Sequence, residues 1–316
     1  MTKSKHYLDR VLEASVVGSF SSLGWELRRR VEHFTPLQAR PGRVVVLTGA
    51  TSGLGRYSAL ELSRLGCHVL AVGRNQSRLD ELVRDAGSTE GSITGFACDL
   101  SDMDAVLGLA DELVATKLPI EVIIHNAGAL ASSYSTTAQG FEVTLATHLL
   151  GPYVLNKHLN VNRETTVIFV TSGGMYTEAF NLETLEMSAT GFKGSVAYAR
   201  AKRAQTVLMT YLSATQRCHA LSVHPGWTNT PGLSESLPGF YKVLKPVLRS
   251  LEAGADTLLW AATQAPCEPP AGQLYFDRRP RSMFRLAKTK VSDVALEAQG
   301  VTLAAWLDDR LSAWLT

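Results

Sequence analysis

Two side chains that could exchange a proton with a substrate lie four residues apart, in the stretch Tyr198-Ala-Arg-Ala-Lys202. Residues at this spacing share one face of a helix. A phenol with a pKa of about 10 is a poor acid or base near neutrality, but a nearby ammonium group favours the phenolate and lowers that pKa. The pair could therefore protonate a carbonyl oxygen or deprotonate an alcohol. Taken alone, the same spacing is also typical of an exposed Tyr/Lys pair on a surface helix.

A glycine turn nearer the N-terminus, Thr48-Gly-Ala-Thr-Ser-Gly-Leu-Gly55, could hold a diphosphate. Residues 44–47 before it form the continuous apolar run of a buried parallel strand, and apolar residues at helical spacing follow it. Glycines let a backbone approach a pyrophosphate, and the helix N-terminus offers free N–H groups. We therefore expect a dinucleotide site, with an ordinary strand-to-helix turn as the alternative. Its residues would be Gly49, Thr51, Ser52, Gly53, Leu54 and Gly55.

The end of the second expected strand, residues 67–72, indicates which dinucleotide binds. An NAD site carries Asp or Glu at about this place, to accept hydrogen bonds from the ribose 2′-hydroxyl. Here the chain reads Gly73-Arg74-Asn75, with no acid. Arg74 could pair with a 2′-phosphate through its planar guanidinium, or be a solvated surface arginine. The sequence predicts NADP(H) rather than NAD(H).

Strands and helices continue to alternate beyond this point. A helix over 77–86 leads to a strand over 92–97, and further strands follow over 121–125 and 166–170. This alternation predicts a single α/β domain with a Rossmann-like, doubly wound parallel sheet between two helix layers. The ligand crevice should lie at the carboxyl edge of the strands. Asp99 follows the third strand, and could face the adenine or cap the next helix with Ser101.

In this order and at these spacings the motifs resemble the short-chain dehydrogenase/reductase family, from about residue 42 to about residue 280. The glycine turn is similar to its T-G-x-x-x-G-x-G motif, Asn126-Ala-Gly128 to its N-A-G motif, and Tyr198 with Lys202 to its Y-x-x-x-K motif. The resemblance implies carbonyl–alcohol interconversion in which Tyr198 transfers the proton, Ser172 hydrogen-bonds the substrate oxygen and Lys202 also holds the nicotinamide ribose. Pro225-Gly226 with Thr230 resembles the stretch that contacts the nicotinamide end. The implied cofactor contacts beyond the glycine turn and Arg74 are Asp99, Leu100, Asn126, Ala127, Gly128, Tyr198, Lys202, Pro225, Gly226, Thr228 and Thr230.

Four shorter stretches narrow the resemblance to one branch of the family, which has a similar N-terminal extension. They are Ser-Gly-Gly-Met (172–175), His-Pro-Gly-Trp (224–227), Thr-Pro-Gly (230–232) and Phe-Asp-Arg-Arg-Pro (276–280).

The chain departs from the family pattern at His148, where an asparagine usually relays protons from the lysine to solvent. A histidine with its ordinary pKa of about 6.5 can also shuttle protons, which would make the rate more sensitive to pH. The alternative is a histidine that packs differently beside a slow or inactive site. The protein would then be an NADP(H)-binding sensor or scaffold with little turnover.

Two segments could shape a substrate pocket. Ser172 and Tyr198 lie 26 residues apart, about twice the spacing in many members, and Met175 and Tyr176 are pocket candidates within the added segment.

Residues 231–247 carry Pro and Gly around apolar side chains, which suits either a mobile lid or an ordinary surface loop. Its apolar residues, Leu233, Leu237, Phe240 and Tyr241, favour a hydrophobic carbonyl or alcohol as substrate.

The two ends flank an expected catalytic domain over residues 41–290. In the extension, residues 1–40, Phe20, Leu23, Leu27, Val31 and Phe34 recur at helical spacing near Arg28, Arg29 and Arg30. We expect a helix that packs on the body or on another subunit, with peripheral membrane contact as the alternative. Residues 291–316 predict a helix that packs on the domain through Ala304, Leu307, Leu311, Trp314 and Leu315.

Composition limits which classes of partner, metal site and cellular compartment remain to be considered. With 316 residues, 45% of them hydrophobic, and a net charge of +2, the chain can bury a sizeable core and gives no reason to expect nucleic acid as a partner. The four cysteines, Cys67, Cys98, Cys218 and Cys267, are scattered, which argues for a reducing compartment and against a metal site. We expect a cytoplasmic protein, and the resemblance implies a homo-oligomer, a dimer or a tetramer.

Overall fold

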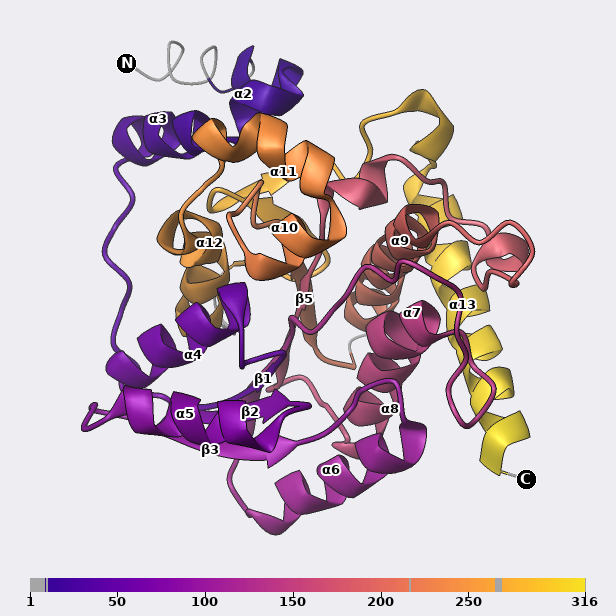
Figure 1. The fold of residues 1–316 in the computed structure, drawn as a ribbon, viewed down its shortest axis with the longest axis horizontal. Coiled ribbons are helices and arrows are strands. Elements are labelled where there is room, and N and C mark those ends of the chain that lie inside the picture. The colour runs from indigo at the N-terminus through magenta and orange to yellow at the C-terminus, as the bar shows by residue number, and fades with distance from the viewer. Residues whose placement is uncertain (1–8, 10, 216, 265–268, 316) are drawn as a thin grey trace.

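The computed structural model describes residues 9, 11–215, 217–264 and 269–315, and its described part contains one eight-stranded sheet (Figure 1). The strand order is β3-β2-β1-β4-β5-β6-β7-β8, with β8 antiparallel to β7 and all other neighbours parallel. The predicted fold class, a single doubly wound α/β domain, is confirmed. The strands are β1 (Val44–Thr48), β2 (His68–Gly73), β3 (Ser92–Ala97), β4 (Ile120–His125), β5 (Thr166–Val170), β6 (His219–Val223), β7 (Leu274–Phe276) and β8 (Arg279–Arg281).

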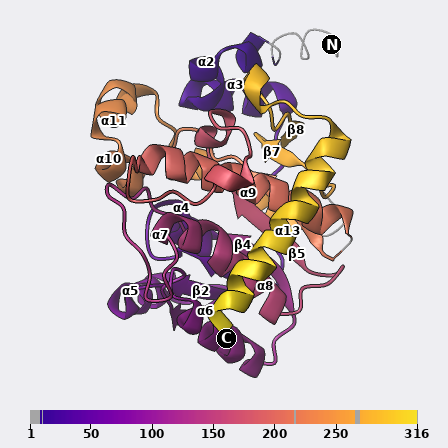
Figure 2. The same cartoon turned by 90° about the vertical axis from the view of Figure 1, so that its right-hand side faces the viewer.

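Helices cover both faces of the sheet. One layer holds α4 (Gly53–Arg64), α5 (Gln76–Ala86) and α12 (Leu251–Gln264), and the other holds α6 (Met103–Ala115), α8 (Gly151–His158) and α9 (Gly194–Ala214). The C-terminal helix α13 (Asp293–Leu315) packs against α9 on the outside of the second layer (Figure 2). The remaining described α-helices are α2 (Val16–Phe20), α3 (Ser22–Glu32), α7 (Val143–Leu145), α10 (Pro231–Ser236) and α11 (Pro238–Leu244).

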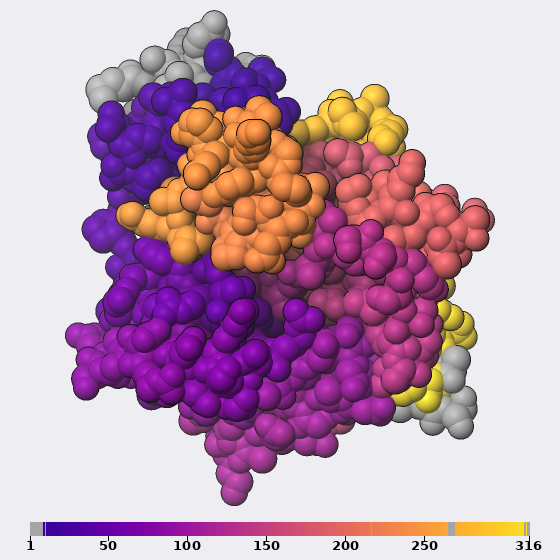
Figure 3. All heavy atoms as spheres, in the orientation of Figure 1, coloured from indigo at the N-terminus to yellow at the C-terminus, as the bar shows by residue number. Residues whose placement is uncertain are grey.

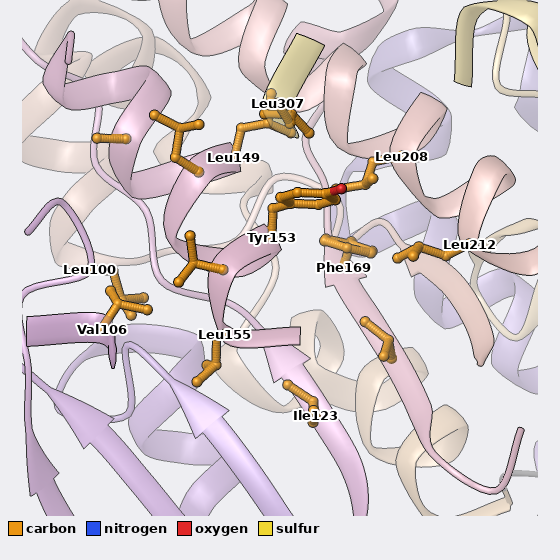
Figure 4. Packing of buried hydrophobic residues seen from close by; sticks show 14 of the residues in the cluster. Leu100, Val106, Ile123, Leu149, Tyr153, Leu155, Phe169, Leu208, Leu212 and Leu307 are labelled. Atoms are coloured by element: carbon orange, nitrogen blue, oxygen red, sulfur yellow. The ribbon is translucent and has the colours of Figure 1, made fainter. Parts of the chain in front are cut away.

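The central strands are apolar because both of their faces are covered. All five positions of β1 and all five of β5 are buried. On the face of the sheet that the second helix layer covers, Phe169 of β5 lies among Leu208, Leu212 and Tyr153, with Leu307 of α13 close by (Figure 4). Complete burial of a side chain of this size contributes about 1.5–3 kcal/mol, so this packing fixes the strands whose ends carry the cavity.

The expected elements agree closely with the observed ones. The strands predicted at 92–97 and 166–170 have those bounds. The strands predicted at 44–47 and 121–125 and the helix over 77–86 differ by one residue at one end, and the strand predicted at 67–72 is shifted by one residue at both ends. Ala304, Leu307 and Leu311 of α13 are buried as predicted. Among the described residues, no helix is both long enough and apolar enough to cross a bilayer. Cys67, Cys98 and Cys218 are buried free thiols, and Cys267 lies outside the described residues.

The described part of the N-terminal extension packs against the β7–β8 hairpin (Figure 2). Of the predicted apolar face, Phe20 is buried and Leu27, Val31 and Phe34 are half-buried. The prediction was wrong at Leu23, which is 61% exposed, whereas Arg28 is 3% exposed. Gly24 of α3 explains part of this orientation, since a Cβ there would lie 2.2 Å from the Gly18 carbonyl oxygen. The helices α2 and α3 therefore contact each other closely, and α3 turns Arg28 inward.

The Arg28 side chain points inward because it pairs with the Asp277 carboxylate in the turn between β7 and β8. Asp277 is completely buried and accepts hydrogen bonds from Arg28 (2.7 Å) and from Arg249 (2.6 and 3.0 Å). Burial alone would raise the pKa of Asp277, but the two guanidinium groups hold it below its usual value. Around it, Arg279 pairs with Glu32, and Arg281 pairs with Asp9. The Phe-Asp-Arg-Arg-Pro stretch is thus the turn that binds the N-terminal extension.

We predict that Asp277→Asn lowers the free energy of unfolding by about 3–5 kcal/mol, because it leaves the buried Arg249 without its carboxylate partner, whereas Arg28 keeps Asp9 and Glu13. Urea unfolding measures the change. The matched control is Asp85→Asn, which removes the partner of Arg56 in an exposed ion pair and should cost less than about 1 kcal/mol. Equal effects of the two substitutions would contradict a stabilising role for the buried cluster.

Candidate active site

A cavity of about 980 Å³ opens at the carboxyl ends of β1, β2, β4 and β5. This is the edge at which doubly wound sheets bind ligands, and its volume lies within the usual range for ligand sites. All of the residues expected to bind cofactor line it, together with Ser172. His148 is absent from the lining.

The glycine turn brings two loops into contact at the bottom of the cavity. Gly49 has a φ of +68°, and a Cβ there would lie 2.8 Å from the Ala127 Cα. A Cβ on Gly55 would lie 2.1 Å from the Gly49 carbonyl oxygen. Helix α4 starts at Gly53, and within the described part of the chain Ser52 caps it without a side-chain hydrogen bond. The first N–H groups of α4 therefore face the cavity and can bind an anion.

The far end of the cavity is basic. Arg74 has a 73% exposed side chain whose guanidinium lies 4.0 Å from the Asp99 carboxylate. Arg78, in the first turn of α5, lines the same end and was missed by sequence reasoning. The only feature of the sequence that could have indicated this position is that Arg78 follows Arg74 by four residues. A Cβ on Gly73 would lie 2.7 Å from the Thr51 side chain, so this position has room only for glycine.

Asp99 and Asn126 are held by bonds within the protein. Asp99 accepts hydrogen bonds from the backbone and hydroxyl of Ser101, whereas Asp102 caps α6. Of the two roles considered for Asp99, helix capping therefore belongs to Asp102. Asn126 donates from its side chain to the Thr48 carbonyl oxygen (2.9 Å). Asn126 thus joins the loops after β1 and β4, beside the place where a dinucleotide would lie.

The three residues expected to act on the substrate meet on one wall of the cavity. Ser172 follows β5 and caps the short turn Gly173–Tyr176. Tyr198 and Lys202 lie one turn apart on α9, with the Lys202 Nζ 5.7 Å from the Tyr198 ring centroid. Lys202 is 2% exposed and donates to the Val170 carbonyl oxygen (2.8 Å).

Burial controls the charges of this pair. It lowers the pKa of Lys202 to about 7, so the ammonium is only partly populated at neutral pH. Burial also raises the pKa of Tyr198, although a hydrogen bond with Ser172 opposes this. The expectation that Lys202 lowers the phenol pKa was wrong for the cofactor-free protein, because the same dry surroundings disfavour both charged forms. Tyr198 is therefore a protonated acid at neutral pH.

His148 lies behind Tyr198. Its ring meets the tyrosine edge to face at 5.2 Å and packs on Gly128, where a Cβ would lie 2.3 Å from the His148 Cε1. Nε2 hydrogen-bonds the Ala129 carbonyl oxygen (2.9 Å), and within the described residues the buried Nδ1 has no partner. Burial, with a smaller effect of Lys202, lowers the pKa of His148 to about 3. The ring is therefore neutral at physiological pH, and the titration near 6.5 considered above is not expected.

The outer part of the cavity is largely apolar. Leu233, Leu237 and Phe240 of the α10–α11 segment line it as expected, together with Trp227 and Leu130. Met175 and Tyr176 were wrong candidates, because both are buried against Phe20 and Phe276, and Gly173, Gly174 and Thr177 line the cavity instead. Tyr241 is also absent from the lining.

Comparison with known proteins agrees with this arrangement. The sequence profile described as short chain dehydrogenase matches residues 43–238. The chain is 34% identical to human dehydrogenase/reductase SDR family member 12 over 267 residues, which is 81% of this chain and 83% of that protein.

The chain belongs to the short-chain dehydrogenase/reductase family.

Two further relatives extend this result. A candidate daunorubicin C-13 ketoreductase, DnrU, from Streptomyces sp. (strain C5) is 33% identical over 252 residues, 78% of this chain and 87% of that protein. The crystal structure of an uncharacterised protein from Mycobacterium paratuberculosis superposes with a TM-score of 0.67 at 26% identity, covering 86% of this chain and 95% of that one. The narrower branch indicated by the four short stretches is that of family member 12, and the match to the human protein confirms it.

We predict that His148 does not titrate between about pH 5 and 8, because burial disfavours the charged imidazolium and the ring stays neutral above its lowered pKa. The pH dependence of the histidine Cε1–H resonances measures this by NMR, with His148→Asn identifying the signal. A His148 resonance that shifts with a midpoint near the ordinary value of about 6.5 would contradict the prediction.

Proposed function

We propose that this protein is an NADP(H)-dependent oxidoreductase that interconverts a hydrophobic ketone or aldehyde and its alcohol. One observation supports this most strongly. A single cavity at the carboxyl edge of the sheet contains the glycine turn, two arginines and the group Ser172, Tyr198 and Lys202. The glycine turn and the arginines suit a phosphorylated dinucleotide, and the group of three suits proton transfer at a carbonyl.

The cavity residues fit this cofactor. The backbone of Gly53 and Leu54 at the start of α4 would hold the pyrophosphate. Arg74 and Arg78 would pair with the 2′-phosphate. The nearby Asp99 carboxylate, 4.0 Å from the Arg74 guanidinium, accepts two hydrogen bonds from Ser101. Thr228, Thr230 and the Pro225-Gly226 turn would meet the nicotinamide half, as the family resemblance implies.

When bound, NADPH supplies the hydride, and the chain supplies the proton. The Ser172 hydroxyl would hydrogen-bond the substrate carbonyl oxygen and hold it next to the Tyr198 hydroxyl, which donates its proton. Burial raises the pKa of Tyr198, so its hydroxyl carries the proton that reduction requires. Lys202, with a pKa of about 7, can exchange protons near neutrality and would return one to Tyr198.

The lining indicates the substrate class. Leu130, Trp227, Leu233, Leu237 and Phe240 surround the outer cavity, and such side chains favour an apolar carbonyl compound over a small charged one. The name of the DnrU relative refers to reduction of a ketone, which agrees with the reductive direction proposed here.

An NADP(H)-binding sensor or scaffold with little turnover is the second candidate function. The observation that favours it is His148, whose neutral ring lies in the usual place of the relay asparagine and makes no hydrogen bond to Lys202 or Tyr198 among the described residues. Saturable NADPH binding without oxidation by any carbonyl compound would distinguish this function from catalysis.

The location and assembly of the protein stay predictions. Val16, Val17 and Leu23 of the N-terminal extension are about half exposed or more, at 46%, 51% and 61%, which supports peripheral membrane contact through residues 1–40. A cytoplasmic location and a homo-oligomer are expected from composition and family resemblance.

The cofactor assignment predicts that Arg74→Glu raises the Kd for NADPH by about 10- to 100-fold, because a charge-assisted hydrogen bond is replaced by repulsion. Nucleotide fluorescence measures NADPH and NADH binding. The matched control is Arg64→Glu, since Arg64 is exposed, pairs with Glu61 and lies outside the cavity. NADPH affinity that Arg74→Glu leaves unchanged, or NADH binding as tight as NADPH binding, would contradict the assignment.

A further inference from the structure

The N-terminal extension contacts the two loops that carry the candidate active site. The Phe20 ring stacks on His224 at 4.6 Å and meets Trp227 edge to face at 5.7 Å. A Cβ on Gly173, the residue after Ser172, would lie 3.5 Å from this ring. Phe20 is 3% exposed, so these contacts are dry. Trp227 in turn meets Phe240 of α11 at 5.2 Å, and Figure 3 shows the orange α10–α11 segment beside the indigo extension.

A second residue, Arg249, holds the loop that contains Trp227 through backbone hydrogen bonds. The Arg249 N–H donates to the Trp227 carbonyl oxygen (2.7 Å), and the Asn229 N–H donates to the Arg249 carbonyl oxygen (2.9 Å). These bonds form an isolated parallel bridge between Thr228 and Arg249. The stretch 227–229 therefore cannot move without breaking backbone bonds to Arg249.

The Arg249 side chain lies directly beneath the turn before that stretch. Gly226 has a φ of +71°, and a Cβ there would lie 2.3 Å from the Arg249 Nε. The guanidinium thus fills the space under Gly226 and supports the Pro225-Gly226 turn. Only glycine fits this contact, because its φ is positive and because the guanidinium approaches its Cα so closely.

Phe20 and Arg249 are joined by one carbonyl oxygen. The Phe20 oxygen accepts hydrogen bonds from the Trp227 N–H (2.9 Å) and from the Arg249 Nε (3.0 Å). Asp277 then binds the other side of the guanidinium with two hydrogen bonds. Since Asp277 and Arg249 are both almost completely buried, movement of the arginine would leave a buried carboxylate with one partner fewer.

We propose that Arg249 is a positioning residue for the cofactor site, which couples the N-terminal extension to residues 225–228 and holds them in the shape that receives the nicotinamide half of NADPH. The proposal rests on the proposed function, because that function assigns residues 225–228 to the nicotinamide half. It gives the extension a role at the active site, through the Phe20 carbonyl oxygen. The adenosine half lies at the other end of the cavity, near Arg74, and does not depend on this support.

The test compares two ligands in the full-length chain by isothermal titration calorimetry. NADPH occupies both ends of the cavity, whereas adenosine 2′,5′-bisphosphate occupies only the adenosine end. In Arg249→Lys the charge opposite Asp277 remains, but an ammonium cannot bond Asp277, the Phe20 oxygen and the Ser19 oxygen in the planar arrangement of arginine. We expect the Kd of this variant for NADPH to rise by about tenfold or more, which corresponds to the loss of one charge-assisted hydrogen bond. Its Kd for the bisphosphate should stay within about twofold of the wild-type value.

The matched control is Arg278→Lys. Arg278 binds Asp256 with two hydrogen bonds and donates to the Thr35 oxygen, so it holds the same extension without touching residues 225–228. Both Kd values should stay within about twofold in this variant. If Arg249→Lys does not fold, Phe20→Leu replaces it, since loss of the ring contacts with His224 and Trp227 should give the same difference between the two ligands.

The outcomes separate the two proposals. If the wild-type protein binds NADPH but Arg249→Lys weakens both ligands alike or neither, the positioning role is overturned and the proposed function stands. If the wild-type protein binds no NADPH, the proposed function fails and the positioning role fails with it.

Discussion

The contact between the loops that leave β1 and β4 is the constraint on which the site depends. At this point the order of the sheet reverses, and Thr48 closes the gap by accepting hydrogen bonds on its hydroxyl from the backbone of Asn126 (3.1 Å) and Ala127 (3.0 Å). Glycine is required at position 49 because a Cβ would collide with the Ala127 backbone, and at position 55 because a Cβ would collide with the Gly49 carbonyl oxygen. The loops can then diverge above the contact, which forms the crevice that would receive the proposed dinucleotide.

A second constraint is the low polarity of the proposed catalytic wall. Lys202 and His148 are almost completely buried and Tyr198 is partly buried, and the pKa of each group is shifted in the direction that favours its uncharged form. A buried charged cluster lies elsewhere, where Arg28 and Arg249 bind Asp277, and Asp9 pairs with both Arg28 and Arg281. The fold thus separates the proposed proton-transfer group from the charged cluster that fixes the extension, and Arg249 connects this cluster to Gly226 and Trp227 in the cavity wall.

Much of the site could be predicted from the sequence because its determinants are local. The glycine turn, Arg74 and the Tyr198–Lys202 pair each depend on short spacings within one strand-to-helix turn or one helix. The buried face of α3 could not be predicted in this way, since Arg28 is drawn inward by Asp277, which lies 249 residues further along the chain. Met175 and Tyr176 failed for a similar reason, because the Phe20 ring that covers them comes from the extension. The lowered pKa of His148 depends on complete burial, which its sequence neighbours do not reveal.

The central claim is that Tyr198 protonates a carbonyl oxygen while hydride leaves the cofactor. The most direct measurement is transfer of label from [4,4-²H₂]NADPH to apolar ketones, with product analysed by mass spectrometry and Tyr198→Phe as the control. The account predicts deuterium at the carbinol carbon with the wild-type protein and a rate about 10²- to 10⁴-fold lower with Tyr198→Phe. Saturable NADPH binding with no label transferred to any ketone, or equal transfer by Tyr198→Phe, would contradict it.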